Sequence, residues 1–261
     1  MHGILFDELA RTSPLRNVNP KTKILLCIGS LLISLMSQTV IIPLVSALLL
    51  SSLILTKGRV QIDTYLRILL IPASFTLIST ALLILLTTTG DTILAVPILS
   101  SLTLLITTDG LHLAATILAR VAGSVTALFF LTLTTPVSDI ITQLRWMKTP
   151  PEITDLMFII YRFIFIFISQ AGQIWQAQIM RLGYQRTKEA IQSFGMLCGS
   201  LFISSWTAGE GLIKAMDNRC YNGIFPSPYE PDSIRLSSLL PVLSYIALLS
   251  SLSWILTIRG F

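Results

Sequence analysis

The stretch Leu236–Ile258, LSSLLPVLSYIALLSSLSWILTI, decides the fold class. It contains no charged residue over a length close to the roughly 20 residues that cross a bilayer as a helix. Similar apolar runs occupy Ile24–Val40, Ile68–Leu86 and Leu111–Thr134. The whole chain is 53% hydrophobic and 12% charged, with a mean hydropathy of +0.78, whereas soluble globular proteins carry about 25% charged residues. The sequence therefore predicts an integral membrane protein made of helices.

The net charge of +5 would suggest a nucleic-acid partner in a soluble protein. Here the basic residues stand between apolar runs, where they set the topology, so no nucleic acid is expected. The cysteines Cys27, Cys198 and Cys220 are far apart in the sequence, which argues against a disulfide framework. Residues 1–23 are polar, so we expect no cleavable signal peptide.

Basic residues indicate the orientation of the first helices. Four of them precede the first apolar run, which places the N-terminus in the cytoplasm. The stretch Ile24–Thr56 is too long for one crossing and contains Pro43, so it predicts two helices joined by an outer turn around Ser37–Pro43. A basic loop then returns the chain to the cytoplasm before the span Ile68–Leu86. These basic residues are Arg11, Arg16, Lys21 and Lys23, then Lys57, Arg59 and Arg67.

The stretch Ile93–Ile106 is apolar but short for a crossing, and Pro97 interrupts it. We expect a re-entrant or partial helix there. If it crossed fully, the span Leu111–Thr134 would end outside, next to the basic residues Arg145 and Lys148. The segment before it, Thr87–Asp91, has no basic residue and is expected to be external.

Residues 135–235 hold half of the Lys and Arg residues, yet contain the apolar stretches Leu156–Ser169 and Ala190–Ala208. One interpretation is a further transmembrane hairpin. The other, which we favour, is a set of amphipathic helices on the cytoplasmic side. Arg162 would cost at least about 2.5 kcal/mol inside a spanning helix unless it were paired. One apolar face contains Trp175, and another contains Trp206 and Met216, with Glu210 and Lys214 expected on the opposite face and spaced for an ion pair.

Two short segments in this region are alike. In each, an alanine precedes an arginine by one helical turn and a tyrosine follows soon after: Ala177 with Arg181, and Ala215 with Arg219. Gly183 and the pair Asn222-Gly223 are expected to supply left-handed residues that end the helices. An arginine near a helix C-terminus also complements the helix dipole for about 0.3–1 kcal/mol. Two matched arginines nevertheless suggest equivalent contacts with a pair of similar subunits, through carboxylates that a guanidinium can bind with two hydrogen bonds.

These endings resemble the short Ala-Arg-Gly motifs of energy-coupling-factor T components. Only the arginine is kept, in Met180-Arg181-Leu182 and Asn218-Arg219-Cys220. The N-terminal residues 6–10, 13–15 and 19–23 are similar to the start of the CbiQ branch, which transports cobalt. Residues 144–152 and Tyr161-Arg162-Phe163 look like that family's entry into its first coupling helix.

The resemblance implies an all-α integral membrane protein with about five transmembrane helices, the partial helix and a cytoplasmic domain of amphipathic coupling helices. The expected divisions are a cytoplasmic segment 1–23, transmembrane helices 24–134, coupling helices 135–235 and a last transmembrane helix 236–261. The chain would be a non-catalytic subunit of a cobalt importer in the cell membrane, with nickel or a vitamin as alternative cargo. Its implied partners are two CbiO-like ABC ATPases and a CbiM-like substrate-binding subunit, with or without CbiN. Arg181 and Arg219 would anchor the ATPases, with Ala177, Ala215 and Gly183 beside them, and Arg162, Trp175, Trp206 and Met216 would make coupling-helix contacts.

Resident sites for ATP, cofactors or metals are not expected. No G-x-x-x-x-G-K-[ST] motif occurs. His112 is isolated, and His2, although a terminal Met-His can chelate metal, has no partner nearby in the sequence. Asp91 and Asp109 suit solvated loops better than catalysis. A stand-alone secondary transporter and a membrane-embedded enzyme are the alternatives. Against the first, we expect charges other than Arg162 to avoid the apolar centres, and against the second we find no catalytic cluster.

Overall fold

The computed structural model describes residues 7, 9–87, 92–99, 102–146, 149–221 and 236–258. The described residues are predominantly helical, as the sequence predicts. The chain divides into two compact units, one comprising Met1–Val137 with Asp232–Phe261 and the other Ser138–Pro231. We describe each unit by itself.

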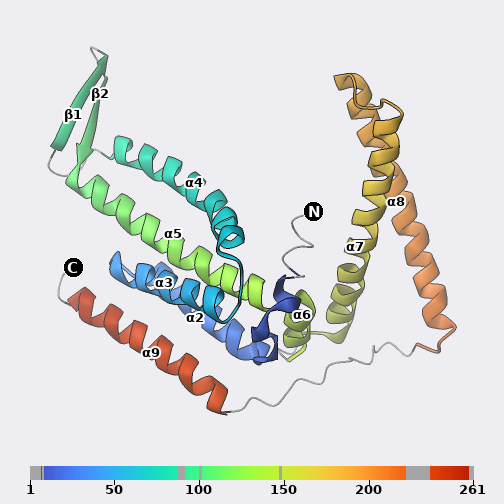
Figure 1. The fold of residues 1–261 in the computed structure, drawn as a ribbon, viewed down its shortest axis with the longest axis horizontal. Coiled ribbons are helices and arrows are strands. Elements are labelled where there is room, and N and C mark those ends of the chain that lie inside the picture. The colour runs from blue at the N-terminus through green and yellow to red at the C-terminus, as the bar shows by residue number, and fades with distance from the viewer. Residues whose placement is uncertain are drawn as a thin grey trace. The chain divides into compact units, whose positions relative to one another are not determined.

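The first unit is a bundle of helices (Figure 1). A short 3-10 helix, η1, precedes α2, whose first turn is capped by the Asn19 side chain, with Pro20 at the first helical position. The elements are η1 (Pro14–Asn17), α2 (Pro20–Met36), α3 (Ile41–Thr56), α4 (Ile62–Leu86), β1 (Thr92–Leu99), β2 (Leu102–Thr107), α5 (Thr108–Thr134) and α9 (Leu236–Ile258). The predicted division of Ile24–Thr56 into two helices is confirmed, because α2 ends at Met36 and α3 begins at Ile41.

Helix α5 lies at the centre of this unit. It packs against α2, α3 and α4, while α9 packs against α2 and α3. The core forms where apolar side chains of α3 and α5 meet, and Leu50, Ile54 and Leu133 are completely buried there. Small residues allow the closest approach, since Gly123 of α5 faces the fully buried Ser34 and Ser46.

Two cations connect α2 to α5 through hydrogen bonds, one near the start of α2 and one just after its end. Lys23 of α2 is 3% exposed, and its Nζ donates to the carbonyl of Thr134, the last residue of α5, at 2.9 Å. Arg120 of α5 donates from Nε to the carbonyl of Ser37, just after α2, at 2.8 Å. Each cation thus meets the C-terminal carbonyl end of the other helix, where positive charge is favourable. The expectation that charges other than Arg162 avoid the apolar centres was wrong, because Arg120 stands inside the run Leu111–Thr134.

Three helices among the described residues are long and apolar enough to cross a membrane: Ile62–Ile84, Thr108–Thr134 and Leu239–Leu256. Ile41–Thr56 is a shorter apolar helix. Three of the four predicted apolar runs therefore coincide with α4, α5 and α9, whereas the run Ile24–Val40 corresponds to α2, which is not among these three helices.

The prediction of a re-entrant or partial helix at Ile93–Ile106 was wrong. The segment forms an antiparallel hairpin of β1 and β2 that leads directly into α5 (Figure 1). Ala95 pairs with Leu105 and Val96 with Leu104. Isoleucine, valine and threonine favour strands, and Pro97 stands next to a register irregularity, one of the few places where a strand tolerates proline.

The described residues of the second unit form α6 (Val137–Trp146), which starts at the last residue of the first unit, α7 (Pro151–Met180) and α8 (Thr187–Asp217). Helices α7 and α8 lie side by side, joined by the turn at residues 181–186 (Figure 1). Neither belongs to the three helices that qualify as membrane spans. Both are long enough to span, with 30 and 31 residues, so length is not what keeps them outside that group.

Candidate functional site

The two arginine segments end their helices with the same backbone conformation. Arg181 is followed by Leu182, whose φ is 61°, and Arg219 is followed by Cys220, whose φ is 56°. Both are left-handed conformations, which L side chains other than asparagine and aspartate adopt rarely. Among the described residues only one other non-glycine residue, Arg59, has a positive φ. The similarity of the two segments therefore extends from the residue pattern to the backbone.

The hydrogen bonds of the two turns agree as well. The amide of Gly183 donates to the carbonyl of Gln178 at 2.9 Å, and the amide of Tyr221 donates to the carbonyl of Met216 at 3.1 Å. Each bond joins residues five positions apart across a left-handed residue, which is the arrangement of the Schellman motif. Arg181 and Arg219 therefore occupy equivalent positions, immediately before the left-handed residue of each motif.

The prediction that Gly183 supplies a left-handed residue was wrong, because Leu182 takes that conformation one position earlier. Gly183 instead permits a close approach. A Cβ at this position would lie 2.6 Å from Oγ of Ser193 in α8, and that hydroxyl donates to the Gly183 carbonyl at 2.8 Å. Gln178 reinforces the turn, since its Nε2 donates to the Ser193 carbonyl at 2.9 Å and its Oε1 accepts from the hydroxyl of Tyr184 at 2.8 Å. The pair Asn222-Gly223 lies outside the described residues.

Both guanidinium groups are available to a partner. Arg181 and Arg219 are exposed, and within the described ranges neither side chain makes a hydrogen bond or ion pair. Ala177 and Ala215, one turn earlier on the same faces, are also exposed. Small side chains there leave the approach to each guanidinium open. Backbone hydrogen bonds thus hold each turn, while its guanidinium has no ion-pair partner in the part of the chain that the structure describes.

Arg162 lies elsewhere in the second unit. It lines a groove of about 370 Å³ between α7 and α8, together with apolar side chains of both helices. The aromatic rings of Phe158 and Phe163 are among its neighbours, and Asp155, which is 3% exposed, also lines the groove. The structure thus separates Arg162 from the two helix ends that carry Arg181 and Arg219.

The remaining predicted contact residues lie on α7 and α8. Trp175 and Trp206 are 52% and 64% exposed, whereas Met216 is half-buried. The indole Nε1 of Trp206 donates to Oε1 of Glu210 at 2.9 Å. The placement of Glu210 opposite Trp206 was therefore wrong, and in the described part of the chain Glu210 makes no ion pair with Lys214.

Among the described residues, no group of three or more His, Cys, Asp or Glu side chains lies close enough together to hold a metal ion. Asp109 and His112 are both exposed on the first turns of α5. His2 and Asp91 fall outside the described residues.

Comparisons with known proteins agree on one family. The model of the CbiQ family, described as cobalt transport protein, matches residues 11–229. A putative fused cobalt transport protein CbiMQ of Methanocorpusculum labreanum is 37% identical over 95% of this chain and 41% of its own length. This chain therefore spans less than half of that fused relative.

Two further relatives are similar over most of both chains. An uncharacterised protein of Methanocaldococcus jannaschii is 32% identical over 85% of this chain and 82% of its own length. The energy-coupling factor transporter transmembrane protein EcfT of Thermanaerovibrio acidaminovorans is 28% identical over 81% of this chain and 80% of its own. Together with the family match and the apolar helices, these findings show that the chain belongs to the CbiQ family of cobalt transport proteins, and that it is a transmembrane T component of an energy-coupling-factor transporter.

Proposed function

We propose that this chain is the coupling subunit of a cobalt importer, which passes ATP-driven movement from two ABC ATPases to a separate substrate-binding membrane subunit. The observation that carries the proposal is the pair of equivalent helix ends, each presenting an exposed arginine from the same backbone motif. Two identical contacts suit two similar partner subunits. ATP would be hydrolysed by the partners, and this chain would be non-catalytic.

The choice of partners and cargo follows from the relatives. The name of the fused relative joins CbiM to CbiQ, so we infer a CbiM-like substrate-binding subunit. Apolar side chains exposed on α7 and α8, including Trp175, Phe202 and Trp206, would bind that subunit. Cobalt follows from the family, with nickel or a vitamin as alternatives because cargo would be selected by the partner.

Reconstitution tests this function. Co-expressed with its neighbouring transporter subunits, the chain is expected to purify with both ATPases and to support cobalt uptake that needs ATP. In proteoliposomes alone it should move no cobalt. A stand-alone secondary transporter predicts the reverse result, namely uptake by the isolated chain driven by an ion gradient and no bound ATPase.

We also propose five membrane crossings, by α2, α3, α4, α5 and α9, with the N-terminus and residues 135–235 in the cytoplasm. The asymmetry of basic residues supports this orientation. In a chain without its three cysteines, a single cysteine at Gln185 should resist an impermeant thiol reagent added to intact cells, whereas one at Thr89 should react. Labelling of Gln185 from outside would overturn the orientation.

A further inference from the structure

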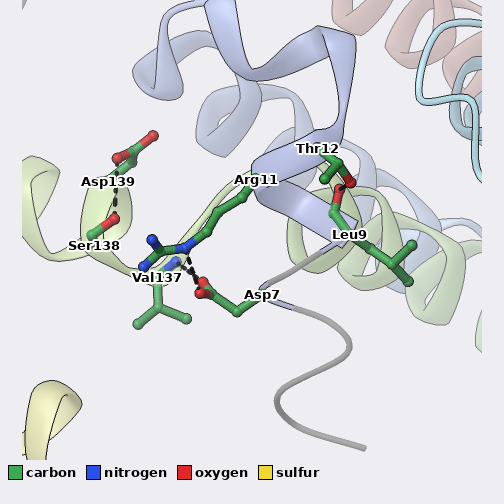
Figure 2. A network of polar contacts seen from close by, with 7 residues as sticks. All are labelled: Asp7, Leu9, Arg11, Thr12, Val137, Ser138 and Asp139. Carbon is green, nitrogen blue, oxygen red and sulfur yellow. Dashed lines mark hydrogen bonds and ion pairs between the residues drawn. The ribbon is translucent and has the colours of Figure 1, made fainter. Parts of the chain in front are cut away.

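Two charged side chains from the N-terminal part of the chain, Lys23 and Asp7, contact the two ends of the short connection between α5 and α6. Figure 2 shows the contact of Asp7 with Val137. Helix α5 ends at Thr134 and α6 begins at Val137. Lys23 donates to the Thr134 carbonyl at 2.9 Å. Oδ1 of Asp7 accepts the backbone N–H of Val137 at 3.4 Å, although 130 positions separate these residues. Thr134 and Thr135 are 0% and 2% exposed, so the connection is buried.

The signs of these charges match the helix ends that they meet. A cation lies at the carbonyl end of α5, and an anion lies at the amide end of α6, as the helix dipole favours. Arg11 holds the anion in place, because its Nε donates to Oδ2 of Asp7 at 2.7 Å. The Asp7 side chain is 10% exposed and that of Arg11 is 53% exposed, so the carboxylate lies against the helix start while the guanidinium reaches water. In Figure 2 the Asp7 carboxylate faces both the Arg11 guanidinium and the backbone N–H of Val137.

Among the described residues, no side chain of α6 accepts a hydrogen bond from the first amide of the helix. The residue before Val137 is Pro136, which carries no side-chain oxygen to accept a hydrogen bond from the first turn. Asp139 stands in the first turn, but its Oδ1 accepts from the hydroxyl of Ser138 at 3.3 Å. The carboxylate of Asp7 therefore acts as the cap of α6 from a distant part of the sequence.

We propose that Asp7, fixed by Arg11, is a positioning residue that sets the start of α6, the segment through which the chain passes from the first unit into the second. Asp7 would stabilise the first turn of α6. If the proposed function holds, this stable turn would also help to transmit movement along the chain. A loose start of α6 would let the second unit move without moving the first.

The test compares Asp7→Asn, Asp7→Ala and Asp63→Asn in the full complex. Asp63 is an exposed aspartate in the first turn of α4 and makes no hydrogen bond or ion pair through its side chain among the described residues, so it controls for loss of charge. Hydrogen exchange of the amides of residues 137–141 should quicken about tenfold in Asp7→Ala and less in Asp7→Asn, which keeps an acceptor oxygen. Asp63→Asn should leave this exchange unchanged. ATPase co-purification should stay normal in all three, while cobalt uptake falls several-fold in Asp7→Ala only.

One result would refute the role of Asp7 as a helix cap, and another would refute its role in transport. Unchanged exchange in Asp7→Ala refutes the cap. Faster exchange with normal uptake refutes the positioning role in transport. Because the exchange measurement needs neither ATPase nor cargo, failure of the proposed function, seen as absent ATPases in the unmodified complex, is a separate result.

Discussion

Replacing Arg181 and Arg219 together by alanine is expected to remove the ATPases from the purified complex and to abolish cobalt uptake. Each guanidinium is exposed and lacks a partner among the described residues, so we expect it to enter an acidic groove of an ATPase. Losing one partner of such a charged, hydrogen-bonded contact costs about 2–5 kcal/mol, which is at least about 30-fold in affinity. Each single variant should weaken attachment, and the double variant should weaken it further.

Replacing Arg181 and Arg219 by lysine distinguishes the contribution of the positive charge to ATPase attachment from that of the planar guanidinium. Lysine keeps the positive charge but not the planar pair of donors, so it should restore attachment only in part. Folding should survive every arginine variant, because an arginine at a helix C-terminus contributes at most about 1 kcal/mol through the dipole. The measurement is co-purification of the ATPases at matched expression, together with the thermal unfolding of each variant.

The left-handed residues provide the matched control. Glycine adopts the φ of Leu182 and Cys220 without steric cost, so Leu182→Gly with Cys220→Gly should raise stability by about 1 kcal/mol per site and leave the ATPases bound. If the double alanine variant keeps its ATPases and normal uptake, the coupling role of Arg181 and Arg219 is wrong. If the double alanine variant is less stable but still binds the ATPases, the two arginines act only as charges that complement the helix dipole.

The second large effect is expected at Gly123, where α5 meets α2 and α3. A Cβ there would lie 2.7 Å from Oγ of Ser34 and 2.9 Å from the carbonyl oxygen of Pro43. The carbonyl is backbone and is itself bonded to the buried hydroxyl of Ser46, so it cannot rotate away. Gly123→Ala should destabilise the protein by about 1–3 kcal/mol through overpacking, and Gly123→Val by more.

Alanine substitutions at two other glycines, Gly29 and Gly199, serve as comparisons for Gly123→Ala. A Cβ on Gly29 would first meet the end of the flexible side chain of Ile246, so Gly29→Ala should cost less than Gly123→Ala. Gly199 in α8 has no atom within 4 Å of the added Cβ, and alanine there should favour the helix by up to about 1 kcal/mol. Thermal unfolding in detergent measures the series. Equal midpoints for Gly123→Ala and Gly29→Ala would contradict the close packing of α5.

Apolar length was sufficient to predict the helices of the first unit. The uncharged run Leu236–Ile258 is the same range as α9, and proline with small polar residues marked the turn between α2 and α3. The same reasoning failed at Ile93–Ile106, because a short apolar run gives no periodicity that separates a buried helix from a strand. Its β-branched residues, which favour strands, were the available signal.

The site was only partly predictable, for reasons of geometry. The spacing of Ala177 and Arg181, and of Ala215 and Arg219, located both helix ends, but the left-handed residues went unpredicted because leucine and cysteine rarely adopt that conformation. Residue patterns within one helix also cannot reveal contacts between distant segments. The packing of α2 against α5 brings Lys23 to Thr134 across 111 positions, and the fold likewise brings Asp7 to Val137 across 130.

The hydrogen bonds of Lys23 to Thr134 and of Arg120 to Ser37 fix the position of the α2–α3 hairpin along the axis of α5. With 17 and 16 residues, its helices are about 25 Å long, whereas the hydrocarbon core of a bilayer is about 30 Å thick. Helix α5, with 27 residues, is about 40 Å long and continues past the turn that Arg120 holds. If this hairpin crosses a membrane, as proposed above, its short helices would require a response to hydrophobic mismatch such as local thinning of the bilayer. Such thinning would bring lipid headgroups and water closer to Arg120, whose guanidinium binds the turn between α2 and α3.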